Sequence, residues 1–173
     1  RNRTPVHVHV GATDTIGRLV TLDGNAIQPG GEGRVQIMLG REIHAVRGDT
    51  VVLRDQSALR TMGGGRILDP LPIVRGRTRA VRMAYLDAMA LEDAGAAARR
   101  SLECLPEGIE LELFARSWNL TAGQASELFD ALPMVSIKSS VGAVGIPAEQ
   151  WQSLKSGLLD ALQAMHDEAP DHK

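Results

Sequence analysis

The chain has 173 residues, 43% of them hydrophobic, and a formal net charge of -2 from interspersed charges of both signs. This composition is that of a soluble globular protein and excludes the disordered and membrane classes, since no run approaches the roughly 18 to 20 apolar residues that span a bilayer. The single cysteine, Cys104, cannot form an internal disulfide. We expect a cytoplasmic monomer without membrane contact and, because the chain opens on Arg1 rather than Met, a piece of a longer protein.

Charge is divided unevenly between the two halves. Residues 1–82 contain 13 Arg, no Lys and 7 acids, a net charge of +6, whereas residues 83–173 contain 3 Arg, 3 Lys and 14 acids, a net charge of -8. A polyanion should therefore prefer the first half, where Arg can hold phosphates in bidentate contacts. A GC-rich genome also favours Arg over Lys and explains the residue type equally well, though not its position.

The first part of the chain has the rhythm of an all-β unit. Short runs rich in Val, Ile, Leu and Thr alternate with Gly, Pro and Asp, which predicts strands at residues 6–10, 18–22, 34–39 and 50–54. Twelve of the 18 glycines lie within the first 76 residues, as the tight turns of a small barrel require. We predict a β-barrel over residues 1–73, followed by a basic, glycine-containing linker over residues 74–82.

Helical patterns follow the linker. Residues 80–91 and 94–105 have apolar side chains at helical spacing, and residues 109–120 and 122–132 predict a helix–turn–helix whose second helix opens on a capping box of Thr121 and Gln124. The following segment predicts a hairpin that pairs Val135 and Ile137 with Val144 and Ile146. A helix–turn–helix with a hairpin behind it is a winged helix, which we place over residues 83–147.

The last segment, residues 148–173, predicts an amphipathic helix that begins after Pro147 and starts a second, truncated winged-helix module. Its apolar stripe consists of Trp151, Leu154, Leu158, Leu162 and Met165. The predicted fold class is therefore multi-domain, β followed by α+β: a small β-barrel, a winged-helix domain and a C-terminal helix.

The sequence offers no enzyme site. It has no GxxxxGK[ST] motif, and Gly63–Gly65 precede a strand-like run rather than a helix, so these glycines indicate a bulge or close packing rather than a phosphate loop. His7 and His9 share one side of a strand, but no third ligand lies nearby in sequence, which favours ordinary barrel histidines over a metal pair. We assign no catalytic residues and no metal ligands.

The predicted second helix of the winged helix is unsuited to phosphate. It carries Gln124, Ser126, Glu127 and Asp130 and no basic residue, whereas contact with nucleic acid requires Lys or Arg. We interpret this module as a spacer or protein-contacting element, with weak RNA contact as the alternative. A DNA-binding transcriptional regulator and a protein-interaction module remain alternative functions for the whole chain.

One segment carries a family resemblance. LRDQSALRTMGGGRILDP, residues 53–70, resembles the closing strands of the third domain of translational GTPases of the elongation factor Tu type. Its GGG-x-(I/V)-L-D-P ending is more similar to the selenocysteine-specific elongation factors, and VHVHVGATDTIGRL resembles the strand pair near the start of that domain. The resemblance covers most of residues 5–72, and the winged helix after the barrel is similar to what those factors carry there.

The resemblance implies a role in selenocysteine incorporation. In that family the third domain lies along the T-arm of the aminoacyl-tRNA, and the C-terminal winged helices reach toward an mRNA hairpin. The implied partners are selenocysteinyl-tRNA, the ribosome and, through further modules, the mRNA hairpin, while GTP and Mg belong to a GTPase domain outside this chain. The implied tRNA-binding residues are Arg54, Asp55, Gln56, Ser57, Arg60 and Thr61. Pairing of Arg54 with Asp55 inside the barrel is the alternative for those two residues.

Overall fold

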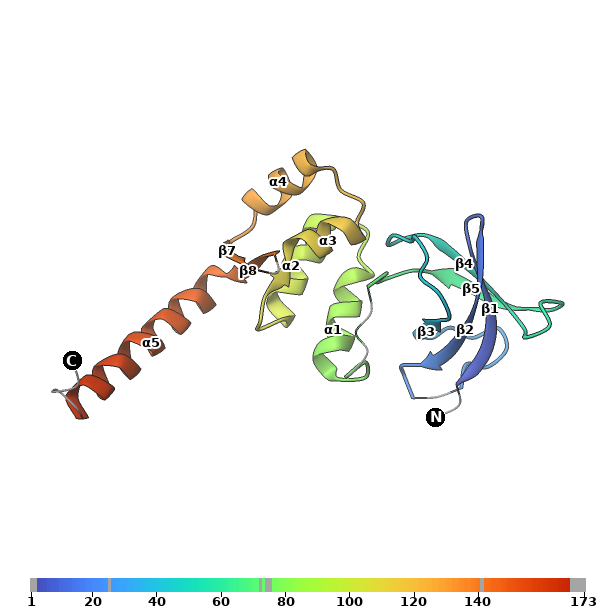
Figure 1. Cartoon of the computed structure of the whole chain (residues 1–173), viewed down its shortest axis with the longest axis horizontal. Helices are drawn as coiled ribbons and strands as arrows, with labels where there is room; N and C mark the ends of the chain where they lie inside the picture. The colour runs from blue at the N-terminus through green and yellow to red at the C-terminus, as the bar shows by residue number, and fades with distance from the viewer. Residues whose placement is uncertain (1–2, 25, 72, 74–75, 141, 169–173) are drawn as a thin grey trace.

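The computed structural model describes residues 3–24, 26–71, 73, 76–140 and 142–168, and Figure 1 shows a β unit, a helical module beside it and a long helix that projects from the module. The strands are β1 (Thr4–Val10), β2 (Thr13–Thr21), β3 (Val35–Leu39), β4 (Thr50–Arg54), β5 (Thr61–Arg66), β6 (Ile109–Glu110), β7 (Met134–Ser139) and β8 (Gly142–Pro147). The helices are α1 (Ala80–Met89), α2 (Ala94–Cys104), α3 (Leu111–Ser117), α4 (Ala122–Asp130) and α5 (Ala148–Glu168).

The β unit is one antiparallel sheet in the order β3-β2-β1-β4-β5. Alternation along the central strand β1 buries Val6, Val8 and Val10, and β4 adds Val51 and Leu53 to the same core. Each of these valines and leucines packs on one face of the sheet, and the segments after β3 and β5 cover that face with Ile43, Ala45 and Ile67. The sheet thus curls around its own core in the manner of a barrel.

The helical module has the winged-helix arrangement that the sequence predicted. Helices α3 and α4 are joined by a short turn, and β7 and β8 form the hairpin behind them. The register pairs Val135 with Ile146 and Ile137 with Val144, as expected. The capping box at Thr121 and Gln124 is also confirmed, since the two residues exchange side-chain and backbone hydrogen bonds.

The first helix of the predicted pair starts later than expected. Ile109 and Glu110 form the short strand β6, which pairs with Gly145 and Val144 of β8 to make a three-stranded sheet in the order β6-β8-β7. The reason lies in the preceding residue: Gly108 has a φ of 84°, and a Cβ there would clash with the carbonyl oxygen of Gly145. Only glycine lets the two backbones approach closely enough for the extra pairing.

Helix α1 begins at Ala80, so its first turn lies within the residues 74–82 that the sequence analysis assigned to a linker. Residues 74 and 75 of that segment, and residues 169–173 of the last expected segment, lie outside the described residues. The tri-glycine run lies in β5, at the edge of the sheet, and its members have no positive φ. The glycines lie beside a shift of register in the β4–β5 pairing, in line with the expected bulge, whereas the strand ends at Arg66 and does not include the next two residues of the run that the sequence analysis interpreted as strand-like.

A buried ion pair joins the barrel to the helical module. Asp69, just after β5, accepts a hydrogen bond of 2.6 Å from Arg82 of α1, and the two side chains are only 5% and 10% exposed. The Arg82 guanidinium carbon also lies 5.3 Å from the centre of the Tyr85 ring. Burial, followed by the nearby charge of Asp69, raises the pKa of the Tyr85 hydroxyl. The pair therefore fixes α1 against the end of the barrel in a poorly solvated environment.

Breaking this pair from one side should destabilise the fold strongly. Asp69→Ala leaves the Arg82 guanidinium buried without its counter-charge, which costs about 3 to 5 kcal/mol in comparable buried pairs. Urea unfolding followed by circular dichroism measures this loss. Glu103→Ala is the matched control: its partner Arg100 is exposed, so the free energy of unfolding should change by less than about 1 kcal/mol. Equal losses in the two variants would contradict the assignment.

Candidate nucleic-acid interface

The residues that the sequence analysis placed at a tRNA-facing turn lie together in the loop between β4 and β5. The two strands pair from Thr50 with Arg66 to Arg54 with Thr61, with a shift of register after Leu53. Beyond this pairing, the Asp55 amide donates to the Arg60 carbonyl at 2.9 Å and closes the loop. The hairpin projects away from the helical module (Figure 1). Its loop is therefore open to a partner.

Asp55 organises this loop from within. Its Oδ1 atom accepts hydrogen bonds from the amides of Leu59 at 2.9 Å and Arg60 at 3.2 Å, and from the Ser57 hydroxyl at 3.0 Å. The Arg60 amide bond is the largest of the effects that lower the pKa of the Asp55 carboxyl. The Asp55 Oδ1 atom and the Ser57 hydroxyl are thus engaged within the loop, which gives these two residues a role in shaping it.

Arg54 does not pair with Asp55. Among the ion pairs of the described ranges none joins these two residues, and the Arg54 guanidinium instead donates to the Ala58 carbonyl at 3.3 Å. Both Arg54 and Arg60 are exposed, as is Thr61 at the start of β5. The alternative of an ion pair inside the barrel is therefore not what the structure has, and the two guanidiniums remain available to an external anion.

Gln56 contributes in a way that the sequence did not indicate. The Nε2 atom of His7, in the middle of β1, lies 3.1 Å from the Gln56 carbonyl oxygen, so the imidazole donates a hydrogen bond that ties the loop to the sheet. The Gln56 side chain itself is exposed. His7 faces Arg54 directly across the β1–β4 pair. This contact gives His7 a structural role in the barrel, which is the interpretation that the sequence favoured.

Two apolar side chains at this edge were also missed. Leu59, at the tip of the loop, is 88% exposed, and Met62 in β5 is 52% exposed. The sequence contained a signal for Leu59, because an apolar residue that lies between polar loop residues and an arginine is not expected to be buried in the core. Exposed apolar groups beside two arginines suit a partner that offers both phosphates and flat apolar surface.

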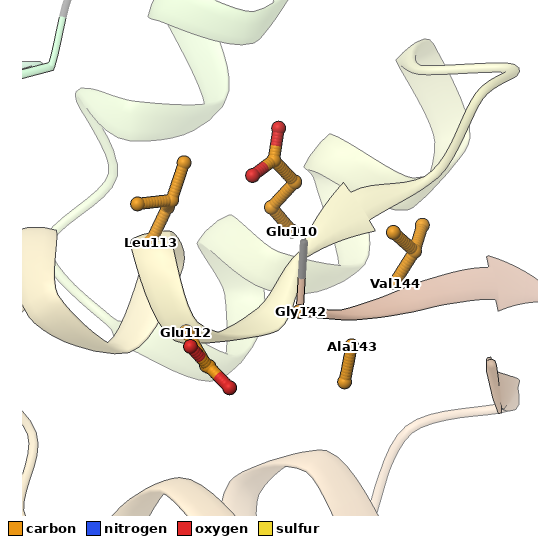
Figure 2. Close-up of a pocket in the computed structure, with 6 residues that line it drawn as sticks. All are labelled: Glu110, Glu112, Leu113, Gly142, Ala143 and Val144. Carbon is orange, nitrogen blue, oxygen red and sulfur yellow. The ribbon is translucent and has the colours of Figure 1, made fainter. Parts of the chain in front are cut away.

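Other parts of the chain offer less. Helix α4 buries none of its residues and presents Glu127 and Asp130 without a basic side chain, as expected. A cavity of about 50 Å³ lies beside the wing, where Glu110 and Glu112 point away from one another (Figure 2). It is far below the volume of a small-molecule site, whereas a second cavity of about 630 Å³, lined by Asp69, Arg82 and Tyr85 among others, lies where the barrel meets the helical module and has the volume of such a site. Burial raises the pKa of the Cys104 thiol, so its thiolate is disfavoured.

Two classes of site receive no support from the described ranges. Within them no three His, Cys, Asp or Glu side chains are grouped closely enough to hold a metal ion. None of the helices described combines the length and apolar character that crossing a membrane requires. The exposed loop between β4 and β5 is thus the strongest candidate for a functional site.

Comparisons with known proteins agree with this architecture. The model of one family, described as the β-barrel domain of selenocysteine-specific elongation factors, matches residues 1–73. A selenocysteine-specific elongation factor of Desulfomicrobium baculatum is 34% identical over 102 residues, which are 59% of this chain and 15% of that protein. The crystal structure of a bacterial selenocysteine-specific elongation factor superposes on 98% of this chain and 25% of that one, with a TM-score of 0.63 and 19% identity.

The fold is thus that of a translation-factor β-barrel followed by an α/β region with a C-terminal helix, which confirms the predicted fold class. More particularly, residues 1–73 match the model of the β-barrel domain of selenocysteine-specific elongation factors, and the chain is similar to such factors, as its residues 53–70 indicated. The chain spans about 15% of the length of the curated relative.

The loop should lose its order in acid. Because the folded-state pKa of Asp55 is lowered, its stabilising effect is present above the ordinary carboxyl pKa of about 3.9 and is lost as pH falls through the lower folded value. The amide resonances of Leu59 and Arg60, followed by NMR between pH 6 and pH 2, should shift together below pH 4. In Asp55→Asn this titration should be absent. The same titration in both proteins would contradict the role of Asp55.

Proposed function

We propose that this chain docks selenocysteinyl-tRNA through the loop between β4 and β5 and links that contact to mRNA-binding modules during selenocysteine incorporation on the ribosome in the cytoplasm. The observation that carries the proposal is the exposure of Arg54 and Arg60 on a loop that Asp55 and His7 hold in shape. A preformed loop loses little conformational entropy when it binds a partner, and guanidinium groups are well suited to binding phosphate.

The proposed contacts follow from the chemistry of each residue. Arg54 and Arg60 would hold phosphates, while the exposed Gln56 side chain and the Thr61 hydroxyl can reach ribose hydroxyls. Leu59 would pack on a sugar face. Asp55 and Ser57, the other two residues of the predicted set, act indirectly by shaping the loop, since the carboxylate is occupied by hydrogen bonds from Ser57, Leu59 and Arg60.

The chain itself performs no catalysis under this proposal. GTP and Mg would be bound and hydrolysis carried out by another domain of the parent protein, because the sequence of this chain contains no GxxxxGK[ST] motif. The winged helix serves as a spacer between the tRNA-binding barrel and later modules. Its α4 helix, with Glu127 and Asp130 and without a basic residue, would repel a phosphate backbone.

Substitution of the loop arginines should weaken tRNA binding. In the 173-residue chain, Arg54→Gln and Arg60→Gln should each lower the affinity for a selenocysteine tRNA transcript and reduce the slope of log affinity against log salt by about 1, as loss of one phosphate contact does. Filter binding over a salt series measures both quantities. Arg99→Gln, which removes an exposed arginine from α2, is the matched control and should leave the slope unchanged.

The same assay distinguishes the alternatives. Preferential, sequence-dependent binding to duplex DNA, unaffected by the loop variants, would favour a DNA-binding regulator. Binding to neither nucleic acid, together with association with ribosomal proteins, would favour a protein-interaction module. Either result would overturn the proposed docking of tRNA.

We further propose that α5 is the first helix of a second winged-helix module. Every residue from Gln152 to Asp167 is exposed, although the stripe Leu154, Leu158 and Leu162 is 53 to 61% exposed and strongly apolar. Such a stripe normally faces a core. Only the start of α5 is anchored, by its contacts with β7 and β8 and by a hydrogen bond from Gln150 to the Pro106 carbonyl.

The stripe should therefore be dispensable in this chain. Leu158→Gln with Leu162→Gln removes apolar surface that the chain itself does not bury, so the melting temperature of the remaining fold should stay within about 2 °C of the parent, because surface changes cost little. Self-association measured by sedimentation should decrease. Leu102→Gln, in the core of the helical module, is the control and should lower the melting temperature sharply. A similar loss in the α5 variant would mean that the stripe packs within this chain.

A further inference from the structure

The turn before β4 contacts the winged helix at several points. Val46 to Asp49 form a tight turn in which the Val46 amide donates to the Asp49 carboxylate at 2.9 Å and Gly48 has a φ of 91°. The Gly48 amide donates to the Ile67 carbonyl at 2.8 Å, and the Ile67 amide donates to the Asp49 carbonyl at 2.9 Å. The turn is therefore fixed to the barrel on both sides.

Arg47 extends from this turn to the C-terminal end of α1. Its Nε atom donates to the Met89 carbonyl at 2.9 Å, and its terminal nitrogen donates to the carbonyls of Ala90 and Leu91. The carbonyls of Met89 and Ala90 are among those that a helix leaves without internal partners, Leu91 follows the C-cap, and the last turn of α1 has no basic residue of its own. Arg47 thus supplies, from the barrel, the positive charge that favours a helix C-terminus.

The same side chain contacts the helix–turn–helix. The Arg47 guanidinium carbon lies 4.0 Å from the centre of the Trp118 ring, which in turn stacks on Phe114 in the core of the helical module. The Arg47 amide also donates to the carbonyl of the buried Ser117 at 2.8 Å. One residue of the barrel is therefore bonded to α1, to the end of α3 and to the turn between α3 and α4.

We propose that Arg47 is the positioning residue that fixes the angle between the barrel and the winged helix. Strand β4 starts at Thr50, beside this turn, and ends at Arg54, at the proposed tRNA-facing loop. Strand β4 thus connects the turn that carries Arg47 to the proposed tRNA-facing loop, over five residues or about 17 Å. The orientation of the winged helix relative to the loop is set at the base of the β4–β5 hairpin.

A fixed angle would help the chain to bridge tRNA and mRNA, and this inference rests on the proposed function only for the purpose that the angle serves. A bridge between two RNA sites gains most when the distance between its contacts matches the distance between the sites. The angle itself does not depend on RNA. The experiment below contains no RNA, so its failure is distinguishable from failure of the tRNA-docking proposal.

Pulsed electron paramagnetic resonance between two spin labels tests the angle. The labels are placed at Asp14→Cys on β2 and Glu127→Cys on α4, both exposed positions, in the full chain carrying Cys104→Ser. The unaltered junction should give one narrow distance distribution. Arg47→Ala should give a broad one, and so should Arg47→Lys, because an ammonium cannot both stack on Trp118 and bond the separate carbonyls at the end of α1.

Two controls keep the result interpretable. Arg18→Ala removes an exposed arginine of the same sheet and should leave the distribution narrow. Amide protection at Val8 and Phe114, measured by hydrogen exchange, reports whether each core is intact in the Arg47 variants, and Arg47→Lys is the fallback if Arg47→Ala does not fold. A narrow, unshifted distribution in Arg47→Lys or Arg47→Ala with both cores protected would overturn the proposal.

Discussion

The carboxylate of Asp49 is the constraint on which the arrangement of the molecule depends. By accepting the Val46 amide it holds the turn that presents Arg47, and through its own carbonyl it bonds the strand-like segment at Ile67. The winged helix is attached to the barrel through this turn, and β4 begins directly after it. This four-residue turn therefore helps to position both the exposed loop and the helical module, together with the ion pairs of Asp69 with Arg82 and of Arg34 with Asp87.

The uneven charge of the two halves has more than one cause. Part of the arginine excess of the first half is consumed inside the molecule: Arg34 pairs with Asp87 of α1, Arg47 bonds the end of the same helix, and Arg82 is held by Asp69. Of these contacts, only the Arg34–Asp87 pair uses an acid of the second half. What remains for a polyanion is the smaller set of exposed arginines, of which Arg54 and Arg60 lie on the preformed loop.

Local patterns predicted the elements well because their causes are local. Alternating valines in β1 and the capping box at Thr121 depend on a few neighbouring residues, and both are confirmed. The roles of the individual loop residues could not be predicted from local patterns in the sequence. The hydrogen bonds of Asp55 with Leu59 and Arg60 depend on a shift of register between two strands. The contact of His7 with the Gln56 carbonyl joins residues that are 49 positions apart in sequence. Strand β6 depends on a close approach of Gly108 to Gly145, which the hydrophobic periodicity of the sequence cannot predict.

The exposed stripe of α5 has a consequence for synthesis of the protein. A helix of 21 residues, about 32 Å long, leaves the ribosome before any residues that follow it. At about 5 to 20 residues per second, a covering module of some tens of residues would need several seconds to emerge. During that interval Leu154, Leu158 and Leu162 are open to other nascent chains. Under the proposal that a second module covers α5, slower translation of that module would leave the stripe exposed to other chains for longer.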